Sequence, residues 1–117
     1  MEKENIILYE SNEIFKGKND HFFFHLKAGN GEVTLASQGY TTKANCKNGI
    51  ASVANNSKDE ANFENKTAKD GRCYFVLIAQ NKQIVGNSQM YKSTSARDNG
   101  IHSIHATAVE AETIDLT

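Results

Sequence analysis

An internal repeat constrains the fold of this 117-residue chain more strongly than any other feature of its sequence. When the chain is shifted by 51 residues, segment 24–53 aligns with segment 75–104 without a gap, and eleven of the 30 positions are identical. Similarity at a fixed period is typical of a duplicated supersecondary unit whose copies pack together. We therefore expect one domain, residues 1–117, with internal repeats at about 13–60 and 61–117.

Each repeat contains the alternation of a β-strand. Successive side chains of a strand point to opposite faces, so apolar residues at every second position mark the face toward the core. These inward residues are Phe22, Phe24 and Leu26 in the first repeat and Cys73, Phe75 and Leu77 in the second. A second strand is expected in each repeat, at 32–37 and 83–88, after turns at Asn30-Gly31 and Asn81-Lys82. Lys82 disfavours a strict two-residue turn, so we expect a slightly longer loop with the asparagine in the left-handed conformation.

The period then changes from that of a strand to that of a helix. Apolar residues recur at helical spacing along two matching segments: Cys46, Ile50 and Val53, then Ile101, Ile104 and Ala108. Thr42 and Ser93 precede these stripes at matching positions and predict the N-caps. Asn-Gly pairs therefore fall inside both helices, where glycine costs up to about 1 kcal/mol relative to alanine. We expect a packing reason for this, and assign structural roles to Asn48, Gly49, Asn99, Gly100, Tyr40 and Tyr91.

A further strand is expected after each helix, at 61–67 and 111–117, and segment 12–18 begins the first unit. Each repeat is therefore a unit of the strand–strand–strand–helix–strand type. Segment 6–10 is interpreted either as an additional strand or as a partly ordered arm.

The motifs "LKAGNGEV", "SQGY" and "NGIASV", followed by "SQMY" and "ARDNGI", resemble the YegP-like family of small bacterial proteins of uncharacterised function. The resemblance covers about residues 13–117. It implies an α+β fold with one shared antiparallel sheet, two helices packed on one face and C-terminal strands exchanged between the units. It also implies that single-unit relatives pair as dimers. Departures from the family pattern are Gln38 and Gln89 in place of Glu, Ser57-Lys58 after the first helix, and two histidines, His102 and His105, in the last helix.

Composition argues against several classes of partner. A net charge of −1 provides no electrostatic attraction for nucleic acid or for an anionic membrane. The apolar run "IIL" is too short for a signal sequence or a membrane span, so we expect a soluble cytoplasmic protein. Cys46 and Cys73 are isolated and lack zinc-finger spacing, which predicts reduced thiols, no metal and no cofactor.

The sheet face opposite the helices is the strongest candidate for a binding site. The side chains expected there are His21, Phe23, His25, Lys27, Arg72, Tyr74, Val76 and Ile78. Phe23 and Tyr74 are matched aromatics with basic neighbours, as in platforms that stack single-stranded nucleic acid or an aromatic metabolite. The alternative, which we favour, is that these aromatics are cross-strand packing partners on a half-exposed sheet, or face a partner chain or the N-terminal arm.

Other polar groups give weaker signals. His21 and His25 are too far apart along one strand to chelate one ion, and His102 and His105 lack a third ligand, so solvated helix surface is the favoured interpretation. Both cysteines are expected to be buried, which argues against a nucleophile. The Ser37-Gln38 and Ser88-Gln89 junctions either bind a ligand or, as we favour, satisfy backbone groups.

No catalytic residues are assigned. We expect a non-enzymatic, monomeric binding or interaction module that uses the open sheet face or a sheet edge. Two alternatives stay open: ligand binding on the Phe23/Tyr74 face, and an enzyme or redox protein using Cys46 or Cys73.

Overall fold

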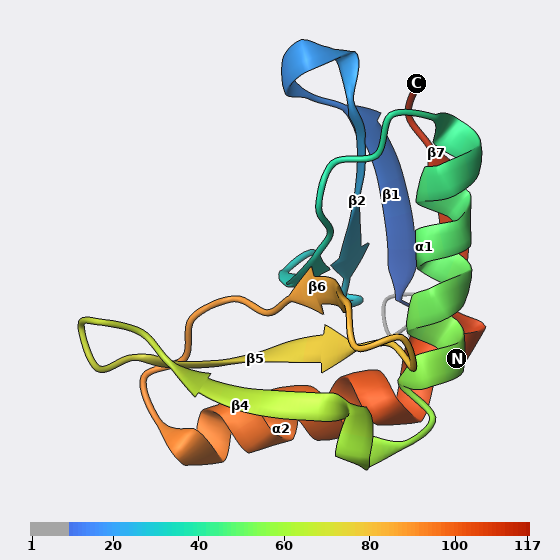
Figure 1. Ribbon diagram of the computed structural model, residues 1–117. Coiled ribbons are helices and arrows are strands. Elements are labelled where there is room, and N and C mark those ends of the chain that lie inside the picture. The colour runs from blue at the N-terminus through green and yellow to red at the C-terminus, as the bar shows by residue number, and fades with distance from the viewer. Residues whose placement is uncertain (1–9) are drawn as a thin grey trace.

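A computed structural model describes residues 10–117, and its elements follow the duplication (Figure 1). The earlier interpretation of segment 6–10 falls, apart from Glu10, outside the described residues. The strands are β1 (Ser11–Lys16), β2 (Phe22–Lys27), β3 (Val33–Ala36), β4 (Phe63–Thr67), β5 (Cys73–Ile78), β6 (Ile84–Asn87) and β7 (Glu112–Asp115). The helices are α1 (Lys43–Asn56) and α2 (Thr94–Thr107), with 3-10 turns η2 (Lys18–Asp20), η3 (Glu60–Asn62) and η4 (Ala108–Glu110).

All seven strands form one sheet in the order β4-β5-β6-β3-β2-β1-β7. The α+β class, the single shared sheet and the tandem duplication are therefore confirmed. Strand exchange is confirmed as well: β4, which follows α1, pairs with β5, and β7, which follows α2, pairs with β1. One detail of the expectation is wrong. The sheet is mixed, because η4 leads the chain into β7 beside the start of β1, and the two strands then run parallel.

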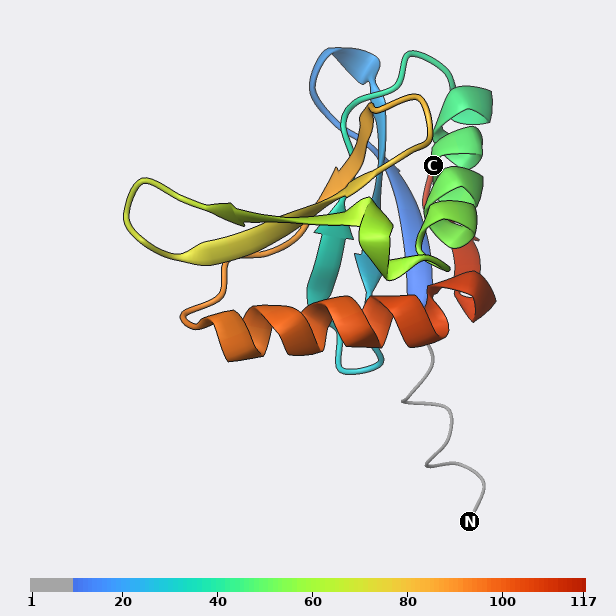
Figure 2. The same ribbon diagram turned by 60° about the horizontal axis from the view of Figure 1, so that its bottom comes forward.

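The two halves of the sheet run across one another, and each carries its own helix (Figure 1). Helix α1 lies along the β1–β2 half and α2 along the β4–β5 half, so the helices also lie crosswise (Figure 2). Buried side chains of both helices, including Val53 and Ile104, form one core cluster with Phe24 and Phe75. The helices therefore cover the same face of the sheet, as expected.

The halves meet at β3 and β6, where Ala36 pairs with Asn87 in antiparallel register. These two residues are 51 positions apart and are thus each other's counterparts in the repeat. When a residue pairs with its own counterpart, a local twofold axis passes between the two. The sheet is consequently a pseudo-dimer within one chain.

The helix boundaries agree with the sequence pattern. The Thr42 side chain accepts a hydrogen bond from the Asn45 amide, and the Ser93 side chain accepts one from the Ala96 amide, so both predicted N-caps are confirmed. The pairs Asn48-Gly49 and Asn99-Gly100 lie inside helices, as predicted. A Cβ built on Gly49 would meet the Tyr40 hydroxyl and lie 3.1 Å from the Phe24 ring, and one on Gly100 would meet the Tyr91 hydroxyl and lie 3.3 Å from the Phe75 ring.

The hairpin turns differ from expectation in one respect. The loops are longer than two residues, as predicted, since the Ala28 amide donates to the Glu32 carbonyl and the Gly31 amide to the Ala28 carbonyl. The left-handed residues, however, are Gly31 (φ 90°) and Lys82 (φ 72°), and the asparagines are not left-handed. Asn30 instead accepts a hydrogen bond from the Glu32 amide through its side chain, which closes the turn.

Candidate functional site

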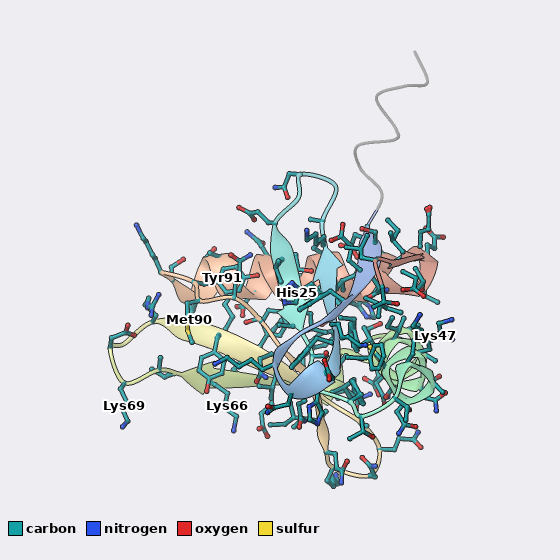
Figure 3. All side chains as sticks on the ribbon, turned by 90° about the horizontal axis from the view of Figure 1, so that it is seen from above. His25, Lys47, Lys66, Lys69, Met90 and Tyr91 are labelled. Carbon is teal, nitrogen blue, oxygen red and sulfur yellow. The ribbon has the colours of Figure 1, made fainter. Side chains whose placement is uncertain are left out.

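The predicted platform of Phe23 and Tyr74 is divided between the two halves of the sheet. Phe23 lies on β2 and Tyr74 on β5, and strands β3 and β6 separate them. At about 4.8 Å per strand, the two backbones are roughly 14 Å apart. In Figure 3, His25 lies over one half of the sheet and Lys66, on β4, over the other. The structure therefore does not place Phe23 and Tyr74 on adjacent strands.

Within the first half, the aromatics of the open face pack on one another. Phe23 is paired with Phe15 of β1, and their rings stack at 5.7 Å between centroids. His25 meets the edge of Phe15 at 4.7 Å, and burial lowers its pKa, with Lys27 acting in the same direction and Glu13 opposing. Lys27 forms an ion pair with Glu13 at 2.9 Å. Cross-strand packing thus accounts for these side chains, and Phe15 is the partner that sequence reasoning missed.

The second half of the open face has different neighbours. Tyr74 is opposite Lys66 on β4, where the first repeat has Phe15, and Arg72 forms an exposed ion pair with Asp70. Val76 is only 2% exposed, so its assignment to an open surface is wrong. It lies between Glu64 and Asn87 on the flanking strands, where it contributes to packing. His21 and Ile78 are half-buried.

The remaining polar candidates have structural partners. The Ser37 hydroxyl accepts from the Phe24 amide and donates to the Gln38 carbonyl, and Ser88 repeats this with Phe75 and Gln89. The favoured interpretation of these junctions, satisfaction of backbone groups, is confirmed. His105 contacts the Ser57 carbonyl at 2.9 Å, and the exposed His102 contacts Glu60 at 2.9 Å. Residues 10–117 contain no cluster of three groups able to hold a metal ion.

Both cysteines are buried and free. Burial raises the pKa of the Cys46 thiol, and the charge of Asp115 acts in the same direction. A raised pKa keeps the thiol protonated, whereas a nucleophilic cysteine requires the thiolate.

Another candidate surface lies where β4 forms one edge of the sheet. Beside it lies an open pocket of about 290 Å³, lined by Glu60, Phe63, Asn65, Asp98, Ile101 and His102. We call this pocket, between the edge of β4 and helix α2, the β4–α2 groove. Among residues 10–117, no strand pairs with the outer side of β4.

The backbone of β4 presents hydrogen-bonding groups to this groove. The amides of Cys73 and Phe75 donate toward the β6 side of their strand, to the Tyr91 carbonyl and the Ser88 hydroxyl. In an antiparallel ladder the residues opposite them then point away from β5. Those residues are Thr67 and Asn65, so their N–H and C=O groups face the free edge.

The first repeat shows what such an edge can hold. There β7 lies against β1, the counterpart of β4, and the Leu116 amide donates to the Ile14 carbonyl at 2.9 Å. Thr113 and Asp115 of β7 line a pocket together with Lys47 and Ile50 of α1. The counterparts of Lys47 and Ile50 on α2 are Asp98 and Ile101, which line the β4–α2 groove. The groove is thus the counterpart of the position of β7, and the sequence signal that could have located it is the 51-residue alignment itself.

These features define a class: a pseudo-twofold α+β domain made from two tandem units on one sheet. The family described as "Domain of unknown function (DUF1508)" matches the chain twice, at residues 18–64 and 68–115, and the chain belongs to this family. A UPF0339 protein of Shewanella oneidensis is 51% identical over 105 residues, covering 90% of this chain and 96% of the relative. UPF0339 protein YegP of Escherichia coli K12 is 46% identical over 105 residues, with coverage of 90% and 96%.

Two solution NMR structures show the same fold. The structure of YegP from E. coli, described as a protein of unknown function, superimposes with a TM-score of 0.88 at 44% identity, covering 94% of this chain and 95% of that chain. The S. oneidensis UPF0339 protein superimposes with a TM-score of 0.86 at 50% identity and 92% coverage of both chains. The resemblance seen in the sequence motifs is confirmed, and no specific activity is attached to these relatives.

Proposed function

We propose that this chain is a non-enzymatic interaction module that binds an extended peptide segment along the free edge of β4. The observation that carries the proposal is internal to the molecule: the first repeat binds a strand, β7, at the equivalent edge. Outward backbone groups of Asn65 and Thr67 supply the hydrogen bonds for an added strand, and the adjacent groove holds its side chains.

An enzyme is less well supported. The Ser37 and Ser88 hydroxyls are engaged by backbone groups, and the buried Cys46 thiol has a raised pKa. These are the properties of groups that stabilise a fold. If either cysteine reacted rapidly with a thiol reagent in the native protein, the redox alternative would regain support.

Stacking of nucleic acid or an aromatic metabolite is also less well supported, since Phe23 packs on Phe15, and two strands lie between Phe23 and the second aromatic, Tyr74. No helix of residues 10–117 is long and apolar enough to cross a membrane. Buried free cysteines fit a reducing cytoplasmic setting. The pseudo-dimer completes its twofold contact within one chain, which fits a monomer.

Selection of peptides from a random phage-displayed library on the immobilised protein tests the proposal. Selected peptides should bind wild type and lose at least about tenfold in affinity to Asn65→Pro, because proline removes an outward N–H and its ring obstructs the edge. Asn65→Ala is the matched control, since it retains the N–H and should retain binding. If the selected peptides bind Asn65→Pro as well as wild type, the edge is not the site.

A further inference from the structure

We infer that the segment bound at the β4–α2 groove runs parallel to β4 and places a lysine or arginine opposite Asn65. This inference rests on the proposed function and specifies its partner. It follows from comparing the charges that surround β7 with those in the groove.

The position of β7 is basic on its helical side. Ile14 of β1 is paired with Asp115, whose carboxylate lies 2.9 Å from the Lys43 ammonium of α1. Lys47, one helical turn further along α1, lines the same pocket as Asp115. An acidic strand therefore packs beside a helix that presents two lysines.

The groove reverses this charge. The counterparts of Lys43 and Lys47 are Thr94 and Asp98, and Glu60 adds a second carboxylate to the lining. Glu60 is paired with His102 through one carboxylate oxygen, and one oxygen of Asp98 contacts Arg97 at 3.3 Å. The second oxygen of Asp98 remains for a cation on the bound segment, because Asp98 is exposed and lines the groove.

The geometry also fixes the register. In β7, Thr113 is opposite Asn12 and Asp115 is opposite Ile14, and both side chains face α1. By the repeat, the corresponding residues of a bound segment are opposite Phe63 and Asn65 and face α2. The residue of the segment opposite Phe63 packs on Ile101 and is small or apolar. The residue opposite Asn65 reaches Asp98 and is basic. A second copy of this chain is disfavoured as the occupant, because its own β7 carries Asp115 at that position.

Two synthetic peptides test this directly. One is residues 109–117 of this chain, capped at both ends, and the other is the same peptide with Asp115→Lys. Titrated into the full-length ¹⁵N-labelled protein, the lysine peptide should shift the amides of Phe63, Asn65 and Thr67, while those of Asn12 and Ile14, which β7 covers, stay in place. We expect it to bind about five- to tenfold more tightly than the unmodified peptide, from gaining one exposed ion pair and losing one repulsion.

The variant Asp98→Lys is the matched control for nonspecific charge effects. It should reverse the preference, so that the unmodified acidic peptide binds more tightly than the lysine peptide. Absence of shifts along β4 with either peptide, or a preference that Asp98→Lys leaves unchanged, would overturn the inference. The proposed function is tested separately, by the library selection. If selected peptides depend on the edge of β4 but carry no lysine or arginine, the proposed function stands and only this specification of the partner is overturned.

Discussion

Strands β1 and β4 are counterparts in the repeat, yet their outer sides differ, and we call the outer side of β1 the covered edge and that of β4 the free edge. β1 is covered by β7, and two buried polar residues lie at that seam, Glu10 just before β1 and Asn12 within it. The matching positions beside β4 are Ala61 in η3 and Phe63, the first residue of β4. The difference follows from connectivity. In a linear duplication, β4 is both the strand that follows α1 and the first strand of the second unit, so one chain supplies only a single additional strand, β7. A duplicated domain of this kind therefore covers the outer side of β1 and leaves that of β4 free, and β7 becomes the other edge strand of the sheet.

A second asymmetry lies beside the pseudo-twofold axis. Leu35 of β3 and Gly86 of β6 are counterparts, and a Cβ built on Gly86 would lie 2.7 Å from the Leu35 Cγ. Equivalent positions approach each other near a twofold axis, and here there is space for one large side chain only. Leu35 fills that space and is fully buried. Comparison of the repeats therefore predicts at which matched positions both repeats can carry the same residue and at which they must carry different ones.

The largest expected effect comes from disturbing this pair. Leu35→Gly leaves a cavity and should cost about 4 kcal/mol, and Gly86→Leu overpacks the same site and should cost about 3 kcal/mol. The double variant moves the leucine across the axis, so its cost should be at least about 2 kcal/mol smaller than the sum. Urea unfolding of the three variants measures this. Additive costs would show that the two positions do not share one space.

The helical glycines provide the converse case, in which both repeats require the same residue. A Cβ on Gly49 would press on the Tyr40 ring, which stacks on Phe24 at 6.4 Å between centroids. Gly49→Ala should therefore destabilise the protein by up to about 2 kcal/mol, because an overpacking cost of up to about 3 kcal/mol exceeds the helix-propensity gain of about 1 kcal/mol. Gly100→Ala should cost less, since Gly100 is half-buried and Gly49 is buried.

Tyr40→Phe in the Gly49→Ala background separates packing from backbone effects. Removing the hydroxyl should recover part of the lost stability, measured by thermal or urea unfolding. Net stabilisation by Gly49→Ala would contradict the packing explanation, because it would mean that the tyrosine moves aside at no cost.

The sequence could predict the elements and the shared core because both depend on local periodicity that the repeat displays twice. Phe24 and Phe75, or Thr42 and Ser93, confirm each other within one chain. The direction of β7 and the burial of Val76 could not be predicted, since each depends on how distant strands approach. The separation of Phe23 from Tyr74 could not be predicted for the same reason: the face of a strand is a local property, whereas the order of strands in the sheet is a global one. The 51-residue alignment relates the β4–α2 groove to the position of β7, and it located the groove once β7 was known to lie against β1.

The smallest expected effect concerns the covered edge, where Glu10 sets a dependence on pH that Ala61 at the free edge lacks. One carboxylate oxygen of Glu10 and the side-chain oxygen of Asn12 are buried without a hydrogen-bond partner among the described residues. Burial raises the pKa of Glu10, and the nearby hydroxyls of Thr107 and Ser103 act in the opposite direction. Below the ordinary pKa of 4.5 the carboxyl is neutral in both states, and its contribution to stability is fully present. As the pH rises through the raised pKa, the folded protein must hold a buried charge and that stability is lost.

Glu10→Gln should accordingly match wild type at low pH and exceed its stability at neutral pH, and the difference should grow through the range above 4.5. Urea unfolding as a function of pH gives both curves. Glu112→Gln is the control, because Glu112 is an exposed neighbour on β7 and its replacement should leave the shape of the curve unchanged. If the curves of Glu10→Gln and wild type ran parallel from low to neutral pH, Glu10 would have the same proton affinity in the folded and unfolded states. The ionisation of Glu10 would then make no pH-dependent contribution to the free energy of unfolding. The covered edge would differ from the free edge only by the presence of β7.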